Sequence, residues 1–184
     1  MKVKRISFWI FLVLLVLLLA NLNRIGRLFY PVKYEACIKE NAAAYAIDPY
    51  LVMGMIKAES NFDEDAVSVK NATGLMQIME PTALWLADRM QLADFEYQDI
   101  TKPEINIKMG CYYISYLIEQ YEGNIENALA AYNAGGGNVN RWLRDSSCSK
   151  DGKALDAIPF PETKRYVNRV LNNMRMYTLL YQQA

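Results

Sequence analysis

Apolar positions recur every three or four residues along most of the chain, which is the spacing of one face of an α-helix. We therefore expect helices over residues 32–46, 48–61, 81–90, 105–121, 126–133 and from 161 onward. Local signals support two boundaries: Asp48 and Pro49 form an N-cap followed by a first-turn proline, and the glycines at 135–137 stop a helix. No alternating run is long enough for a sheet, although residues 74–79 suit a short strand or an extended turn. The sequence predicts a mainly α fold with very little strand.

The first 22 residues differ from the rest because they are almost wholly apolar after a basic start. Three basic residues within the first five positions precede a run over 6–20 whose only polar residue is Ser7. Such a segment is either a cleaved signal peptide or an uncleaved anchor, and the small-residue cleavage pattern is missing. We therefore expect a transmembrane signal anchor over 1–22, a linker over 23–32 and one globular domain over 33–184. This topology predicts a single-pass protein of the cell membrane whose domain lies outside the cytoplasm.

Charge and composition exclude several classes of function. The 184 residues carry 20 basic and 20 acidic side chains, but five of the basic ones lie within the first 27 positions, so the body is net acidic. An acidic body argues against nucleic-acid binding, which needs a basic surface. The chain has no histidine, which removes Ser-His-Asp and Cys-His catalysis and histidine-based zinc sites. The three cysteines, Cys37, Cys111 and Cys148, lack metal-site spacing and allow at most one internal disulfide, and we expect ordinary buried or idle thiols and no metal.

One carboxylate lies on an apolar helix face. At 100° per residue, Glu59 falls in the same narrow stripe as Val52, Met55 and Ile56. The opposite, solvent-facing side is expected to hold Gly54, Lys57 and Asn61. A carboxyl in apolar surroundings loses hydration, which raises its pKa and keeps it protonated near neutral pH, as a general acid requires. The alternative is that the last helical turn frays and lets Glu59 reach water.

Two further segments favour a saccharide site. Residues 74–78 are apolar apart from Gln77, and their glycine suggests a close approach of backbone. Residues 130–135 surround Tyr132 and Asn133 with small residues at a helix end. Aromatic faces together with amide hydrogen bonds are typical of sugar binding, although small residues at a helix end also indicate tight packing.

Over about residues 34–177 the chain resembles the catalytic domain of the soluble-type lytic transglycosylases, which have a goose-lysozyme-like fold. The resemblance rests on five ordered motifs: Glu59-Ser60-Asn61-Phe62; Gly74-Leu75-Met76-Gln77-Ile78-Met79 with Pro81-Thr82-Ala83; Asn106-Ile107 with Gly110 and Tyr121-Glu122-Gly123-Asn124; residues 128–135; and Ile158-Pro159-Phe160 with Glu162-Thr163 and Tyr166-Val167. Glu80 is a small departure, because the second motif usually runs directly into proline.

The resemblance implies cleavage of the β-1,4 bond between N-acetylmuramic acid and N-acetylglucosamine in peptidoglycan, with formation of a 1,6-anhydro ring. Glu59 would donate a proton to the leaving oxygen and then act as base, without a cofactor or metal. The resemblance also implies a set of substrate-binding or orienting residues: Ser60 and Tyr132 beside the acid, Met76 and Gln77 lining the groove, Asn133, and Glu162 and Tyr166 at its far wall. The expected partners are peptidoglycan glycan strands, and the oligomeric state stays open.

Two other functions remain compatible with the sequence. A hydrolytic muramidase would use Asp63 or Asp65 as a second carboxylate shortly after Glu59. A non-catalytic, membrane-tethered wall-binding protein would use the same groove, although a binding module has no need of an acid on an apolar stripe.

Overall fold

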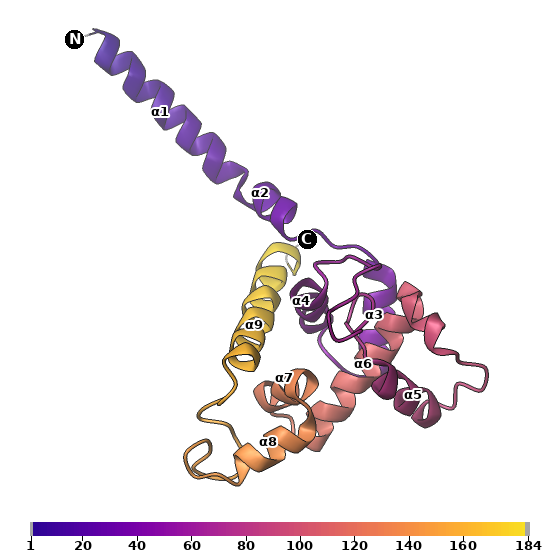
Figure 1. Ribbon diagram of the computed structural model, residues 1–184. Helices are drawn as coiled ribbons and strands as arrows, with labels where there is room; N and C mark the ends of the chain where they lie inside the picture. Colours follow the sequence, from indigo (N-terminus) through magenta and orange to yellow (C-terminus); the bar gives the residue numbers. More distant parts are fainter. Residues whose placement is uncertain (1, 183–184) are drawn as a thin grey trace.

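The computed structural model describes residues 2–182 and is almost entirely helical (Figure 1). Within that range the helices are α1 (Lys2–Ala20), α2 (Leu22–Phe29), α3 (Glu35–Ala44), α4 (Pro49–Glu59), α5 (Glu80–Arg89), the 3-10 helix η1 (Tyr97–Thr101), α6 (Pro103–Gln120), α7 (Ile125–Ala134), α8 (Gly136–Leu143) and α9 (Pro161–Tyr181). Helices α3 to α9 share one hydrophobic core, which confirms the mainly α, single-domain expectation.

The N-terminal helix α1 extends away from the body of the molecule (Figure 1). Its apolar side chains from Phe11 to Leu19 are exposed. Among the described residues, no single helix is long and apolar enough to cross a membrane. Residues 11–20 and 22–29 pass that test only as a pair, bent by 57° at the break between α1 and α2.

The segment expected to be a linker is mostly helical, because α2 occupies Leu22–Phe29 and docks against the end of α9. The Arg27 guanidinium donates to the carbonyl oxygen of Leu180 through Nη2 at 2.7 Å and Nε at 3.1 Å. It also lies 4.7 Å from the centre of the Tyr181 ring. The last helical carbonyls have no intrahelical partner, so an arginine satisfies them well. The junction between α2 and the body is therefore held by specific contacts.

Helix α4 lies at the centre of the body and packs more extensively against α9 than any other two elements pack together. The side chain of Asp48 accepts a hydrogen bond from the Tyr50 backbone N–H, as expected of the N-cap. Gly54 is buried against α9, so the prediction that it faces solvent is wrong. A Cβ at this position would lie 2.9 Å from the Val170 carbonyl oxygen. The glycine thus permits two backbones to approach too closely for any side chain.

The second motif forms a turn over residues 73–78 and not a strand. Thr73 makes two isolated bridges there, one with Val67 and one with Ile78. Buried Asn106 of α6 fixes this turn: its Nδ2 donates to the carbonyl oxygens of Thr73 and Ile100 at 3.0 and 2.9 Å. Its Oδ1 accepts the Met76 backbone N–H at 2.7 Å. One side chain therefore satisfies three backbone groups and holds the turn against α6.

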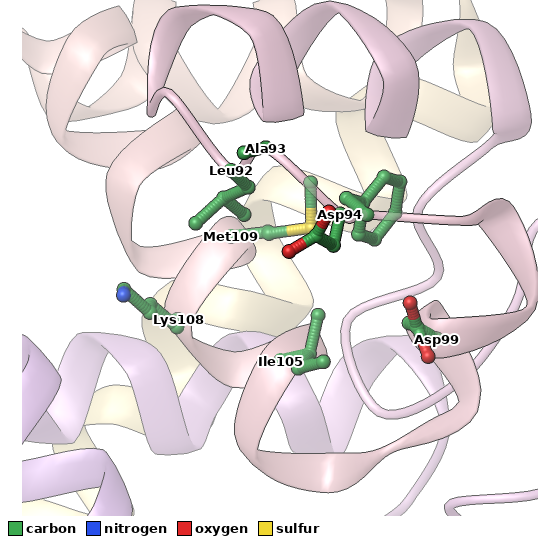
Figure 2. A pocket seen from close by; sticks show the side chains of 8 residues that line it. Leu92, Ala93, Asp94, Asp99, Ile105, Lys108 and Met109 are labelled. Carbon is green, nitrogen blue, oxygen red and sulfur yellow. The ribbon is translucent and has the colours of Figure 1, made fainter.

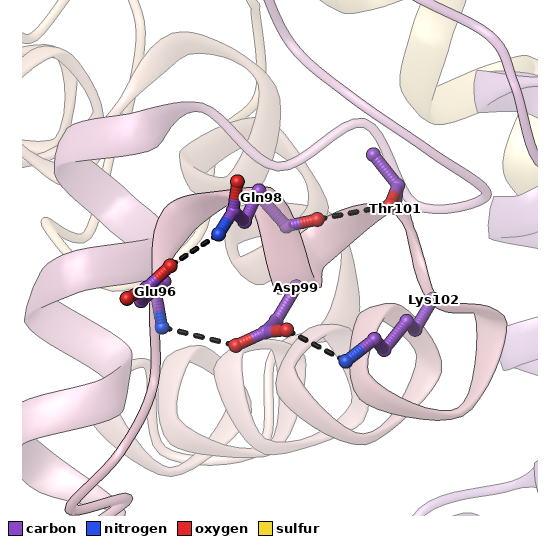
Figure 3. A network of polar contacts seen from close by, with 5 residues as sticks. All are labelled: Glu96, Gln98, Asp99, Thr101 and Lys102. Atoms are coloured by element: carbon purple, nitrogen blue, oxygen red, sulfur yellow. Dashed lines mark hydrogen bonds and ion pairs between the residues drawn. The ribbon is translucent and has the colours of Figure 1, made fainter.

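The loop before α6 is held by local polar contacts around η1 (Figure 3). The Asp99 carboxylate accepts from the Glu96 backbone N–H at 3.0 Å and from Lys102 Nζ at 2.7 Å, and Gln98 donates to the Glu96 carboxylate.

Helix α8 is not among the predicted helices, because the glycines at 135–137 predict only the end of a helix. Gly135, at φ 84°, instead turns the chain directly from α7 into α8.

Candidate active site

Glu59 is the last residue of α4, and the helix stays regular to that point. The Ser60 backbone N–H donates to the Ile56 carbonyl oxygen at 3.0 Å, so the last turn does not fray. Val52, Met55 and Ile56 are fully buried, and Glu59 is partly buried at the end of the stripe that they form. The predicted placement of this carboxyl at the edge of the core is confirmed.

Burial raises the pKa of Glu59 from its ordinary value of 4.5 to about 7. Two groups act in the opposite direction and lower this pKa: the hydroxyl of Tyr166 and the positive charge of Arg169, both on α9. The carboxyl is therefore protonated in a large fraction of molecules at neutral pH, and it is poised both to give a proton and to take one back.

Ser60 connects α4 to the turn over residues 73–78. Its hydroxyl donates to the carbonyl oxygen of Leu75 at 2.9 Å and to that of Ile56 at 3.3 Å. The hydroxyl therefore joins the end of α4 to the turn, and both of these hydrogen bonds are to backbone carbonyls.

Tyr132 reaches the same turn from α7. Its hydroxyl donates to the carbonyl oxygen of Met76 at 2.9 Å, and its ring lies 5.0 Å from the Tyr113 ring, centre to centre. Burial raises the pKa of the Tyr132 hydroxyl well above 10, and the nearby Glu59 raises it further. Tyr132 is therefore close enough to Glu59 to interact with its charge.

Met76 does not line a groove as the resemblance implied. Its side chain is fully buried, and a Cβ built on Gly110 of α6 would clash with its Sδ. The methionine side chain fills the space that this glycine leaves, and the Met76 carbonyl accepts the bond from Tyr132.

Gln77 follows with a positive φ of 48°, the left-handed conformation. Its Nε2 donates to the carbonyl oxygens of Ala66 and Gly74 at 2.9 and 3.0 Å. Both amide hydrogens are therefore used to close the turn, which leaves the acceptor Oε1 as the atom that Gln77 can offer a ligand.

The start of α9 brings the remaining predicted residues beside α7. The buried hydroxyl of Thr163 donates to Asn133 Oδ1 at 2.8 Å, which joins the two helices. Glu162 and Asn133 are exposed, whereas Tyr166 is buried and its hydroxyl interacts with Glu59. The structure therefore brings Tyr132 and Tyr166 to Glu59, and it leaves Glu162 and Asn133 on the surface nearby.

Asp63 and Asp65, the candidates for a second catalytic carboxylate, are both exposed. The influences on the pKa of Glu59 are burial, Tyr166 and Arg169, and no carboxylate is among them. Like charges a few ångströms apart raise each other's pKa strongly. Within the described residues, Glu59 therefore acts as an isolated carboxyl.

Sequence reasoning assigned no role to two residues that shape this site. Asn106 anchors the turn that carries Met76 and Gln77, and a buried amide in an apolar stretch of helix was the signal that could have found it. Arg169 lies one turn beyond Tyr166 and acts on Glu59 by its charge. No sequence signal separates Arg169 from the other basic residues of α9.

Other features of the described residues do not coincide with this site. A hollow of about 290 Å³ lies under the loop before η1, and none of the predicted site residues lines it (Figure 2). Residues 2–182 contain no cluster of three or more side chains suited to a metal ion. The three cysteines are free thiols, and burial raises the pKa of Cys111 to about 12.

Comparison with known proteins places this geometry in context. The family model described as the transglycosylase SLT domain matches residues 36–154. A soluble lytic murein transglycosylase of Salmonella typhimurium is 34% identical over 144 residues, which cover 77% of this chain and 22% of that protein. A membrane-bound lytic murein transglycosylase C of Yersinia pestis is 30% identical over 175 residues, covering 79% of this chain and 47% of that protein.

Solved structures of lytic transglycosylases are also similar to this chain. An inactive mutant of the lytic transglycosylase Slt from Pseudomonas aeruginosa superposes with a TM-score of 0.74 at 33% identity, covering 82% of this chain and 24% of that one. The 70 kDa soluble lytic transglycosylase of Escherichia coli gives a TM-score of 0.75 at 28% identity, covering 84% of this chain and 25% of that one. The chain thus spans about a quarter of the length of the soluble proteins that it matches.

Proposed function

The chain belongs to the transglycosylase SLT domain family, and from that premise we propose that it is a peptidoglycan lytic transglycosylase. The substrate would be the β-1,4 bond between N-acetylmuramic acid and N-acetylglucosamine, and one product would end in 1,6-anhydromuramic acid. The observation that carries this proposal is the single carboxyl of Glu59, whose pKa burial raises to about 7 with no carboxylate beside it.

The reaction needs only one acid–base group. Glu59 donates its proton to the bridging oxygen as the bond from that oxygen to the muramoyl C1 breaks. The C6 hydroxyl of the same muramoyl unit then bonds to C1, and its proton passes to the Glu59 carboxylate. The carboxyl ends in the state in which it began, and no water is consumed. Ordinary retaining and inverting hydrolysis, in contrast, uses two carboxylates.

Neighbouring residues set the pKa and the position of Glu59 during this cycle. A donor with a pKa near the working pH loses and regains its proton with little cost in either direction. The Tyr166 hydroxyl and the Arg169 charge stabilise the carboxylate that exists between the two proton transfers, because both lower the pKa of Glu59. Tyr132 and Ser60 act as positioning residues through the carbonyls of Met76 and Leu75. Gln77 Oε1, Asn133 and Glu162 supply polar contacts to the sugar or its substituents.

We further propose that the chain is anchored at the cell membrane with the domain, residues 33–184, on the wall side. The support is the exposed apolar surface of α1, the basic residues at its start and the bent pair formed with α2. A relative of similar sequence is named as membrane-bound. Membrane fractionation tests this: the protein should sediment with membranes at its full 21.1 kDa and resist alkaline extraction. An N-terminus beginning near Asn21 would show a cleaved signal peptide instead.

Mass spectrometry of digested wall tests the activity. Digests should contain muropeptides about 18 Da lighter than hydrolysed ones, the mass of the water that a lyase does not add. Glu59→Gln should fold and bind glycan strands but release nothing, because an amide cannot deliver a proton. Muropeptides with only free reducing ends would establish a muramidase instead. Full activity of Glu59→Gln would overturn both enzyme functions, since the chain has no histidine to take over the proton transfer.

A further inference from the structure

A second hollow lies apart from Glu59, where the end of α3, the end of α5 and the second half of α6 meet. This cleft has a volume of about 460 Å³ and is lined by Tyr45, Arg89, Tyr112, Ser115, Tyr116, Glu119 and Gln120. Its walls are fixed, because the Ser115 hydroxyl donates to the Tyr45 carbonyl oxygen at 2.9 Å and the Tyr45 and Tyr112 rings meet edge to face at 5.5 Å. The cleft is therefore built into the packing of α3 against α6.

Arg89 presents a preorganised cation in this cleft. Its guanidinium lies 5.2 Å from the centre of the Trp85 ring and 4.9 Å from that of Tyr116. Its Nε points to the Tyr112 hydroxyl at 3.5 Å, and no described carboxylate lies within ion-pair distance. Aromatic faces hold an arginine in place without using its terminal N–H donors. Those donors are directed to a ligand or to water.

Glu119 gives the same cleft an uncompensated negative charge. Its side chain is exposed and forms no ion pair with any described residue. A cation and an anion that face one cleft without pairing with each other match a ligand that carries both charges. The uncharged sugars of a glycan backbone do not offer such a pattern.

Aromatic contacts lead from this cleft back to the active site. The Trp85 ring, which holds Arg89, lies 5.9 Å from the Tyr113 ring, and Tyr113 lies 5.0 Å from Tyr132. Tyr132 in turn bonds the Met76 carbonyl in the turn beside Glu59. The cleft and the turn beside Glu59 are thus joined through the packed rings of Trp85, Tyr113 and Tyr132.

We infer that this cleft binds the peptide branch of the wall polymer, with Arg89 holding a peptide carboxylate and Glu119 holding a peptide ammonium group. The inference rests on the proposed function, because it assigns the charged part of the same substrate. Peptide carboxylates suit the forked guanidinium, and peptide side chains suit the tyrosine walls. Arg89 and Glu119 are specificity residues in this scheme and take no part in the proton transfers.

Two substrates separate peptide recognition from catalysis: glycan strands that carry peptides, and the same strands stripped of peptides by an amidase. With the full chain in detergent, Arg89→Gln should lower kcat/KM on peptide-bearing strands about tenfold, mainly by raising KM. A change of about tenfold is the usual value of one charge-assisted contact. The same variant should act normally on stripped strands. Arg89→Lys should restore part of the loss, and Arg144→Gln, a matched change of an exposed arginine on another face, should have no effect. An equal loss on both substrates, or no loss on either, would overturn the inference.

A binding measurement keeps this result separate from the proposed activity. Peptides released from walls by the amidase are titrated into the Glu59→Gln protein by calorimetry. Affinity should fall in Glu59→Gln/Arg89→Gln. Glu119→Gln added to Glu59→Gln should weaken binding of muropeptides, whose amino terminus stays joined to the sugar so that only a side-chain amine is free, but not of the same muropeptides after N-acetylation. Binding that depends on Arg89 supports the cleft even where wild-type digests contain no anhydro product. Binding indifferent to both residues rejects the cleft even where the enzyme is active.

Discussion

The hydroxyl of Tyr166 interacts with the carboxyl of Glu59 and lowers the pKa that burial has raised. The contact falls outside regular hydrogen-bond geometry, and the buried hydroxyl has no regular partner among the described groups. An unsatisfied buried hydroxyl is uncommon and costs free energy. Its position gives it a use, because the hydroxyl favours the negative form of Glu59 while burial keeps the pKa well above its ordinary value.

Tyr166→Phe removes that hydroxyl and should raise the pKa of Glu59. The proton donor then stays protonated to higher pH, so the alkaline limb of the kcat/KM profile should move upward while the overall rate falls. Stability should change little, because the hydroxyl has no regular bond to lose. Arg169→Gln should move the limb in the same direction, since its charge also lowers the pKa of Glu59. An alkaline limb that stays in place in both variants would show that Glu59 is not the titrating group.

The raised pKa of Glu59 also predicts how stability depends on pH. Between about 4.5 and 7 the native state binds a proton at Glu59 that the unfolded chain releases, so this group's contribution to stability falls as pH rises through that range. Glu59→Gln removes the titration. Its free energy of unfolding should equal that of the wild type near pH 4 and exceed it by at most about 3 kcal/mol at pH 8. Denaturant unfolding at both pH values measures the difference, and a constant difference would contradict the burial argument.

Tyr132→Phe tests the contact between α7 and the turn. The ring still packs, but the Met76 carbonyl oxygen loses its partner, which should cost about 1–2 kcal/mol of stability. Turnover should fall by about one to three orders of magnitude, because the turn beside Glu59 loses its support. Turnover and unfolding are measured on the same preparation. Lower stability with unchanged turnover would assign Tyr132 to the core alone.

Gly54→Ala tests the close approach of α4 and α9. An alanine methyl group would lie 2.9 Å from the Val170 carbonyl oxygen. This backbone atom cannot move aside as a flexible side chain could, so the helices must separate. We expect a loss of about 1–3 kcal/mol in unfolding free energy. Gly137→Ala is the matched control, because a Cβ there meets no atom within 4 Å and alanine favours the helix. Equal stability of the two variants would disprove the close contact.

Asn106→Leu tests the amide that fixes the turn. The substitution keeps the branched shape but removes the partners of the Ile100 carbonyl and the Met76 N–H, while the Thr73 carbonyl keeps its bond from the Ile78 N–H. Stability should therefore fall by more than about 2 kcal/mol. Asn168→Leu on the exposed side of α9 is the control and should stay within about 0.5 kcal/mol of the wild type. Thermal unfolding compares the two, and similar melting temperatures would show that water replaces the amide.

The sequence predicted those features that depend on periodicity and on side-chain chemistry. The stripe of α4 placed Glu59 at the core edge because Val52, Met55 and Ile56 reveal which face is buried. The N-cap at Asp48 and the helix from Pro161 follow from local rules that tertiary contacts did not override. These features are local, so one segment of sequence contains the information needed.

Features that depend on a partner element were not predictable. Gly54 has no side chain to show hydrophobicity, so only the presence of α9 reveals that it is buried. The groove position of Met76 is implied only by the resemblance, and nothing local shows that Gly110, far along the chain, leaves a space for this side chain. The helix over Leu22–Phe29 is not predicted because the carbonyl that Arg27 binds belongs to α9, far along the chain.

The packing of α4 against α9 has a consequence for the timing of synthesis. Helix α9 is synthesised after α4, and it supplies Tyr166, Arg169 and the surface that covers α4. Before α9 docks, the Glu59 carboxyl lacks this cover, and we expect its pKa to lie nearer the ordinary value of 4.5. A chain in which α9 has not yet docked is therefore expected to carry an ionised carboxylate at Glu59, which is a poor proton donor. The raised proton affinity of Glu59 is thus a property of the packed pair α4 and α9, and not of α4 alone.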